Sequence, residues 1–122
     1  MARALALVPD LLFGSRVQGS LLAAGHDVEL IGDEGALRSR LGESPDTQAA
    51  VLVVDLTDED LDGAGLVESL RGEGLLRQIR TLGFYSHVDA PARARAEQAG
   101  FDLVVPRSRM AREGPELLAR LS

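Results

Sequence analysis

Five short apolar runs, spread along the whole chain, constrain the fold more than any other feature. They occupy residues 4–8, 28–31, 50–56, 81–85 and 101–105. None of them alternates strictly between apolar and polar residues, and strands of this kind are typical of a parallel sheet that is covered on both faces. The sequence therefore predicts five parallel strands, separated by segments that are long enough to form helices.

The segments between the runs carry helix signals. Apolar residues at helical spacing predict a first helix over residues 14–24, and Asp33, Asp62 and Asp89 are expected to cap the second, third and fourth helices. A fifth helix is expected to begin near Pro115. This alternation of strands and helices predicts a single α/β domain over residues 1–122, a flavodoxin-like three-layer sandwich with helices on both faces of the sheet.

The composition excludes several kinds of chemistry. The chain has no cysteine and all 13 basic residues are arginine, so thiolate metal sites, cysteine nucleophiles and lysine Schiff bases are absent. A net charge of −6 and 3% aromatic residues disfavour direct contact with nucleic acid. The first apolar run ends at Pro9, so it predicts neither a signal peptide nor a membrane span. We therefore expect a cytoplasmic protein without a membrane partner.

Polar residues follow the predicted strands directly. In an open parallel sheet, the functional site lies at the carboxyl ends of the strands. The first strand is followed by Asp10, the third by Asp55, the fourth by Ser86 and His87, and the fifth by Arg107. These side chains are therefore expected at one rim of the sheet.

These strand ends resemble those of the receiver domain of two-component response regulators. Asp55 matches the phosphoacceptor, and D-L-T-D-E-D-L-D-G, which starts at Asp55, has the spacing of the loop that follows it in the family. Asp10 matches the second residue of an acidic pair, Ser86 matches a hydroxyl residue, and Arg107 in A-G-F-D-L-V-V-P-R-S stands where the family has a lysine. The resemblance implies the strand order 2-1-3-4-5, a Mg²⁺ site formed by Asp10, Asp55 and Thr57, and phosphoryl contacts from Ser86 and Arg107.

Three positions depart from the family pattern. Pro9 replaces an acid that would help to bind Mg²⁺, so the cation site is expected to be weak. Arg107 is a planar fork and does not act as the point charge of a lysine, and Val104 stands where the family often has a Tyr or Phe. We therefore expect a stand-alone pseudo-receiver that is not an enzyme. By resemblance, it would contact a protein partner, or a second copy, through its fourth helix, fifth strand and fifth helix.

Two alternatives stay open from the sequence. In the first, Asp55 accepts a phosphoryl group as in a working receiver. In the second, a small anionic ligand is held at the rim by Arg16, Arg107 and Arg109, with His87 nearby and with the free N–H groups expected at the start of the first helix. The simpler interpretation of these arginines is that they pair with the carboxylates of Asp10 and Asp55.

Two other motifs predict structure more than chemistry. Asp58, Asp60 and Asp62 imitate the start of an EF-hand loop, but the twelfth position is Ser69 and not Glu, so a solvated loop and a helix cap are expected.

The adjacent Ser86 and His87 are not expected to form a catalytic dyad, because neighbouring residues that leave a strand project to opposite sides. His26, in the turn Gly25-His26-Asp27, is expected at the surface.

Overall fold

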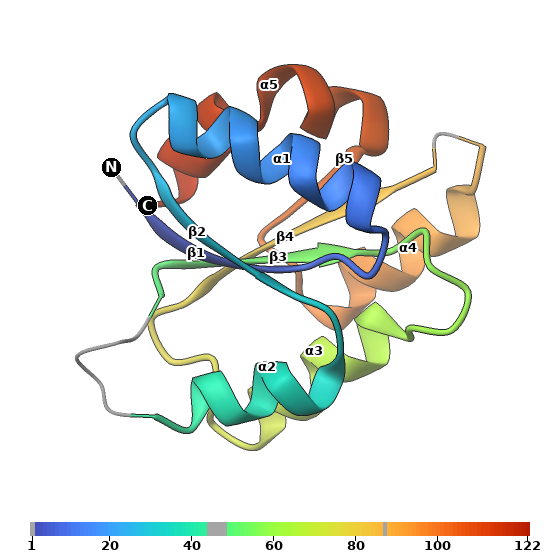
Figure 1. Cartoon of the computed structure of the whole chain (residues 1–122). Coiled ribbons are helices and arrows are strands. Elements are labelled where there is room, and N and C mark those ends of the chain that lie inside the picture. Colours follow the sequence, from blue (N-terminus) through green and yellow to red (C-terminus); the bar gives the residue numbers. More distant parts are fainter. Residues whose placement is uncertain (1, 44–48, 87) are drawn as a thin grey trace.

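The computed structural model describes residues 2–43, 49–86 and 88–122. Within these residues, one parallel sheet contains the strands β1 (Arg3–Leu7), β2 (Asp27–Ile31), β3 (Val51–Asp55), β4 (Arg80–Tyr85) and β5 (Leu103–Pro106). The strand order is β2-β1-β3-β4-β5 (Figure 1). The predicted flavodoxin-like sandwich and its strand order are confirmed.

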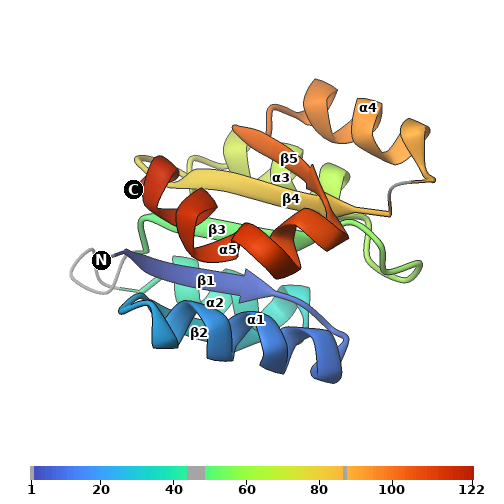
Figure 2. The same ribbon diagram turned by 90° about the horizontal axis from the view of Figure 1, so that it is seen from above.

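The described residues form helices on both faces of the sheet: α1 (Leu11–Ala23), α2 (Glu34–Leu41), α3 (Gly63–Gly72), α4 (Ala90–Ala99) and α5 (Arg107–Leu121). In Figure 1, α1 and α5 cover one face, and α2 and α3 cover the other. Figure 2 shows that α1 and α5 run alongside each other over the sheet. No helix in the part of the chain that the structure describes is long and apolar enough to cross a membrane.

Alternate residues of the central strands point into two separate cores. In β1, Ala4 and Ala6 face the core under α1 and α5, whereas Leu5 and Leu7 face the core under α2, α3 and α4. β3 divides its residues in the same way, with Val51 and Val53 on the first side and Leu52 and Val54 on the second. Because both faces are covered, apolar residues are favoured on either face of the sheet, which explains the near-continuous apolar sequence of β1 and β3.

Aspartates cap four of the described helices. Asp33, Asp62 and Asp89 cap α2, α3 and α4 as predicted, because their side chains accept hydrogen bonds from N–H groups of the first turn. Asp10 is the fourth cap, and it makes α1 begin at Leu11, three residues earlier than predicted. The expectation that Arg16 lies at the start of this helix is wrong, because the free N–H groups belong to the preceding turn.

The predicted start of the fifth helix is also wrong. α5 begins at Arg107, directly after β5, and Pro115 lies inside it. A proline inside a helix removes one backbone hydrogen bond, but the apolar face formed by Met110, Leu117 and Leu118 is buried against the sheet along the whole helix. This burial stabilises the helix on both sides of the proline. Arg107 therefore occupies the first position of a helix and not a loop.

His26 is buried, contrary to the sequence expectation. Its side chain is 7% exposed, its Nδ1 accepts the N–H of Ala2 at 3.0 Å, and its Nε2 lies 3.2 Å from the carbonyl oxygen of Pro115. Because Nδ1 accepts a hydrogen bond, the ring hydrogen is on Nε2 and is donated to Pro115. The imidazole thus joins the start of β1, the turn before β2 and the middle of α5.

Gly63, the first residue of α3, lies directly against β3. A Cβ atom at this position would be 2.7 Å from Cγ1 of the buried Val54 and 2.9 Å from Cδ2 of Leu56. Such distances are too short for van der Waals contact, and the β-branched Val54 has little freedom to move away. The glycine of the Asp62-Gly63 pair therefore has a packing role, which is to let α3 begin on top of β3.

We expect Gly63→Ala to lower the free energy of unfolding by about 1–3 kcal/mol, the usual range for overpacking a core. Gly72→Ala is a matched control, because it lies in the same helix with nothing within 4 Å of the added Cβ. Gly72→Ala should be neutral or should stabilise the fold by up to about 1 kcal/mol. Urea denaturation of the wild type and both variants measures the difference, and equal effects of the two substitutions would contradict this packing role.

Candidate functional site

The carboxyl ends of the strands bring residues from four elements to one cavity. Leu7 pairs with Val54, Asp55 with Phe84, and Tyr85 with Pro106, so the residues that follow these strands leave the sheet at the same edge. A cavity of about 460 Å³ at this edge is lined by Phe13, Arg16, Thr57, Ser86, Arg107, Ser108 and Ala111. The structure thus brings together four residues that the sequence analysis selected, namely Arg16, Thr57, Ser86 and Arg107.

Asp55 lies at the end of β3 and is almost completely buried. Its side chain is held by Thr57, whose N–H and Oγ1 donate hydrogen bonds to Oδ1 at 2.7 and 2.6 Å. Oδ2 has no hydrogen-bond partner among the described residues. No side-chain oxygen or nitrogen in that part of the chain is both fully buried and without a partner. Oδ1 of the predicted phosphoacceptor is therefore engaged by Thr57, and Oδ2 has no partner among the described residues.

Asp10 uses both carboxylate oxygens within the protein. Oδ1 accepts the N–H groups of Leu12 and Phe13 at 3.0 and 3.2 Å, and Oδ2 accepts a hydrogen bond from Nη2 of Arg107 at 3.1 Å. The Phe13 N–H contributes most to lowering the pKa of the Asp10 carboxyl below its ordinary value, and the Leu12 N–H and the Arg107 guanidinium lower this pKa further. Partial desolvation acts in the opposite direction and is outweighed.

The guanidinium of Arg107 is held by an aromatic ring as well as by Asp10. Its Cζ lies 4.1 Å from the centroid of the Phe13 ring, which is a cation–π contact. Phe13 is buried, and its ring lies 5.1 Å from the ring of Phe84 in β4. The contact between Phe13 and Arg107 was not predicted from the sequence. A phenylalanine in the first turn of a helix that starts at the rim is the signal that could have suggested it.

The three arginines that were grouped as an anion site do not all meet. Arg16 lines the cavity and has no ion pair or hydrogen bond with another described residue. Arg109 does not line it, and its Nε lies 3.5 Å from Oε2 of Glu113 on the outside of α5. His87, the other predicted rim contact, lies outside the described residues. Of the three arginines, Arg16 and Arg107 line the cavity and Arg109 does not.

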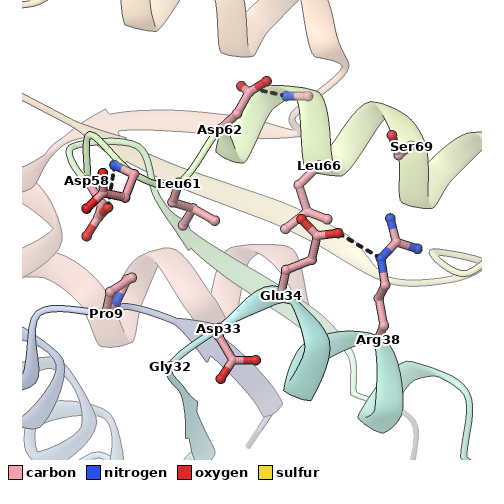
Figure 3. Close-up of a pocket in the computed structure, with 12 residues that line it drawn as sticks. Pro9, Gly32, Asp33, Glu34, Arg38, Asp58, Leu61, Asp62, Leu66 and Ser69 are labelled. Atoms are coloured by element: carbon pink, nitrogen blue, oxygen red, sulfur yellow. Dashed lines mark hydrogen bonds and ion pairs between the residues drawn. The ribbon is translucent and has the colours of Figure 1, made fainter.

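A second cavity, of about 600 Å³, lies between the start of α2 and the start of α3 (Figure 3). Its lining contains five acids, Asp33, Glu34, Asp58, Asp60 and Asp62, and one arginine, Arg38. Most of these acids already have partners. Asp33 and Asp62 are helix caps, Asp58 accepts the N–H of Asp60, and Glu34 pairs with Arg38 at 3.0 Å. The loop and the helix cap predicted for the Asp58–Asp62 segment are therefore confirmed.

In the observed arrangement, fewer carboxylate oxygens are available around Asp55 for a Mg²⁺ ion than the family resemblance implies. Mg²⁺ is usually held by one or two carboxylates and several water molecules. Pro9 offers no carboxylate, Asp10 is engaged by α1 and Arg107, and one oxygen of Asp55 is engaged by Thr57. In residues 2–43, 49–86 and 88–122, no group of three or more histidine or acidic side chains is placed to hold a metal ion.

Solved structures similar to this chain are receiver domains. The receiver domain of the Francisella response regulator 1452 has a TM-score of 0.83 and 15% identity, covering 99% of this chain and 96% of that chain. The Vibrio cholerae chemotaxis protein CheY4 has a TM-score of 0.79 and 18% identity, covering 100% and 99%. The receiver domain of the sensor histidine kinase PA1611 from Pseudomonas aeruginosa PAO1, with a magnesium ion in its active-site cleft, has a TM-score of 0.81 and 18% identity, covering 98% and 96%.

No protein-family model matches the sequence, and no curated protein matches it. At 15–18% identity the likeness to these structures concerns the fold. The chain therefore has the receiver-domain fold of response regulators.

The lowered pKa of Asp10 predicts a defined pH dependence of stability. Because the pKa is lower in the folded chain than in the unfolded chain, the ionised carboxylate stabilises the fold above the ordinary aspartate pKa of about 4. This stabilisation is lost as the pH falls through the lowered value. Asp10→Asn keeps a capping oxygen but has no charge. The wild type should therefore be more stable than the variant at neutral pH.

The difference in free energy of unfolding between wild type and Asp10→Asn should shrink as the pH is lowered from about 7 to about 3. Urea denaturation at a series of pH values measures it. A difference that stays constant over this range would show that the ionised Asp10 does not stabilise the folded state.

Proposed function

We propose that this chain is a response-regulator-like signalling domain, an atypical receiver that acts through protein contacts. In this proposal the Mg²⁺ and phosphoryl site around Asp55 is incomplete. One observation carries it: the Asp10 carboxylate, which by family resemblance would face a cation, caps α1 and pairs with Arg107. The receiver-domain fold supports the signalling class, and Pro9 in place of an acid supports the incomplete site.

The proposed contact surface consists of α4, β5 and α5. β5 is an edge strand of the sheet, and its Leu103 and Val104 are only partly buried, so apolar surface is available between the two helices. A folded protein partner or a second copy of this chain would cover it. A cytoplasmic location, a single domain over residues 1–122 and the absence of direct nucleic-acid or membrane contact belong to the same proposal.

The second candidate is a working phospho-receiver. It is favoured by Oδ2 of Asp55, which has no partner among the described residues, and by Thr57, Ser86 and Arg107, which line the neighbouring cavity. Phosphoryl transfer to a carboxylate requires that the charge of both groups be compensated, which divalent cations usually do. Asp55 would be the acceptor, and Ser86 and Arg107 would contact the phosphoryl oxygens.

A titration with Mg²⁺ and beryllofluoride, a phosphoryl mimic, separates the two candidates. Backbone amide shifts are followed in the wild type and in Asp55→Asn, beside a receiver domain with a complete acidic pair as the positive control. We expect no saturable change in the wild type. A saturable change that disappears in Asp55→Asn would replace the atypical receiver with the phospho-receiver.

A further inference from the structure

We propose that the Arg107 guanidinium is a built-in cation, which takes the position of a divalent ion beside Asp10. It would hold the residues around Asp10 and Asp55 in one arrangement without a metal. This inference rests on the proposed function and deepens it, because it states how the same site is controlled. A receiver of this kind would respond to what binds its surface, and would be indifferent to the concentration of divalent cations.

The backbone delivers Arg107 to the cleft. β4 and β5 pair with Tyr85 opposite Pro106, so Arg107 is the first residue beyond the edge of the sheet and also the first residue of α5. Its side chain therefore starts at the rim, and Nη2 reaches Oδ2 of Asp10 at 3.1 Å. A hydrogen bond between two ionised groups is stronger than a neutral one.

The ion pair alone would be a weak restraint. The side chains of Arg107 and Asp10 are 41% and 44% exposed, and ion pairs at such surfaces contribute little. Both partners, however, are held by other contacts. Arg107 stacks on the Phe13 ring, which is buried against Phe84, and Oδ1 of Asp10 is fixed by the first turn of α1. The positive charge thus stays beside the carboxylate for reasons that do not depend on the ion pair.

A divalent cation in the same place would meet two obstacles. It would lie next to a fixed positive charge, and it would have to displace Arg107 from Asp10. It would also find Oδ1 of Asp55 already bonded to Thr57. An arginine suits this role better than a lysine, because its planar group can stack on Phe13 and donate to Asp10 at the same time.

Calorimetric titration of Mg²⁺ into the wild type and three variants tests the proposal. Arg107→Ala and Arg107→Gln remove the charge, and the second keeps a polar side chain over Phe13. Arg109→Ala is the matched control, because Arg109 lies in the same helix. Arg109 pairs with Glu113 and does not line the cavity. Both Arg107 variants should bind Mg²⁺ at least about tenfold more tightly than the wild type, since a repelling charge is gone and Asp10 is released. Arg109→Ala should bind like the wild type.

The double variant Asp10→Asn, Arg107→Ala should lose the gained affinity, because Asp10 is the carboxylate that Arg107 covers. A second measurement needs no variant. In the wild type, the Nε–H signal of Arg107 should not shift when Mg²⁺ is added. Wild-type affinity equal to that of the Arg107 variants, no gain in a folded Arg107 variant, or a saturable Mg²⁺-dependent shift of the Arg107 signal would each overturn the proposal.

Failure of this inference is distinguishable from failure of the proposed function. If the wild type is silent toward beryllofluoride and the folded Arg107 variants gain no Mg²⁺ affinity, the atypical receiver stands and the built-in cation is wrong. If the wild type responds to beryllofluoride through Asp55, the proposed function itself is wrong.

Discussion

The parallel pairing of β1 with β3 is the constraint on which the rest of the structure depends. Both strands are buried on both faces, so their side chains are divided between two cores and none is available for polar chemistry except at the strand ends. Their register places Leu7 beside Val54, so the chain leaves both strands at the same edge. This geometry places the carboxylates of Asp10 and Asp55 at the same edge of the sheet. The same pairing explains Gly63, because α3 must begin on the surface of β3.

Acidic groups at one edge of a sheet repel one another. In this chain, hydrogen bonds and an ion pair from the protein itself compensate their charge. Asp55 is compensated locally by the N–H and hydroxyl of Thr57, two residues further along. Asp10 is compensated by the first turn of α1 and by Arg107 from α5. Phe13 takes part in both contributions to Asp10, because its N–H donates a hydrogen bond to Asp10 and its ring supports Arg107. Because groups of the protein compensate these carboxylates, an external cation would add less stabilisation than at a site with uncompensated carboxylates. The proposed function rests on this property.

The errors of the sequence analysis have identifiable physical causes. The position of Asp10 after the first strand predicts a place at the rim, but a helix predicted to begin at residue 14 leaves no cap role for Asp10, whereas α1 begins at Leu11. Pro115 was taken for a helix start because proline favours the first turn, but the buried face of α5 carries the helix through it. His26 looked exposed because its turn is polar. Its two partners are distant in the sequence: the N–H of Ala2 is 24 residues away and the carbonyl of Pro115 is 89 residues away.

The sequence by itself determined the five strands, the aspartate caps of α2, α3 and α4, and the identity of the residues at the strand ends. These features depend on apolar periodicity and on hydrogen bonds between near neighbours, which are written in consecutive residues. The sequence favours pairing of the arginines at the rim with Asp10 and Asp55, but only the tertiary structure decided that Arg107 donates to Asp10, 97 residues away, while it stacks on Phe13. That choice depends on where two helices begin relative to the edge of the sheet, and an exposed arginine carries no local signal for which carboxylate it will meet.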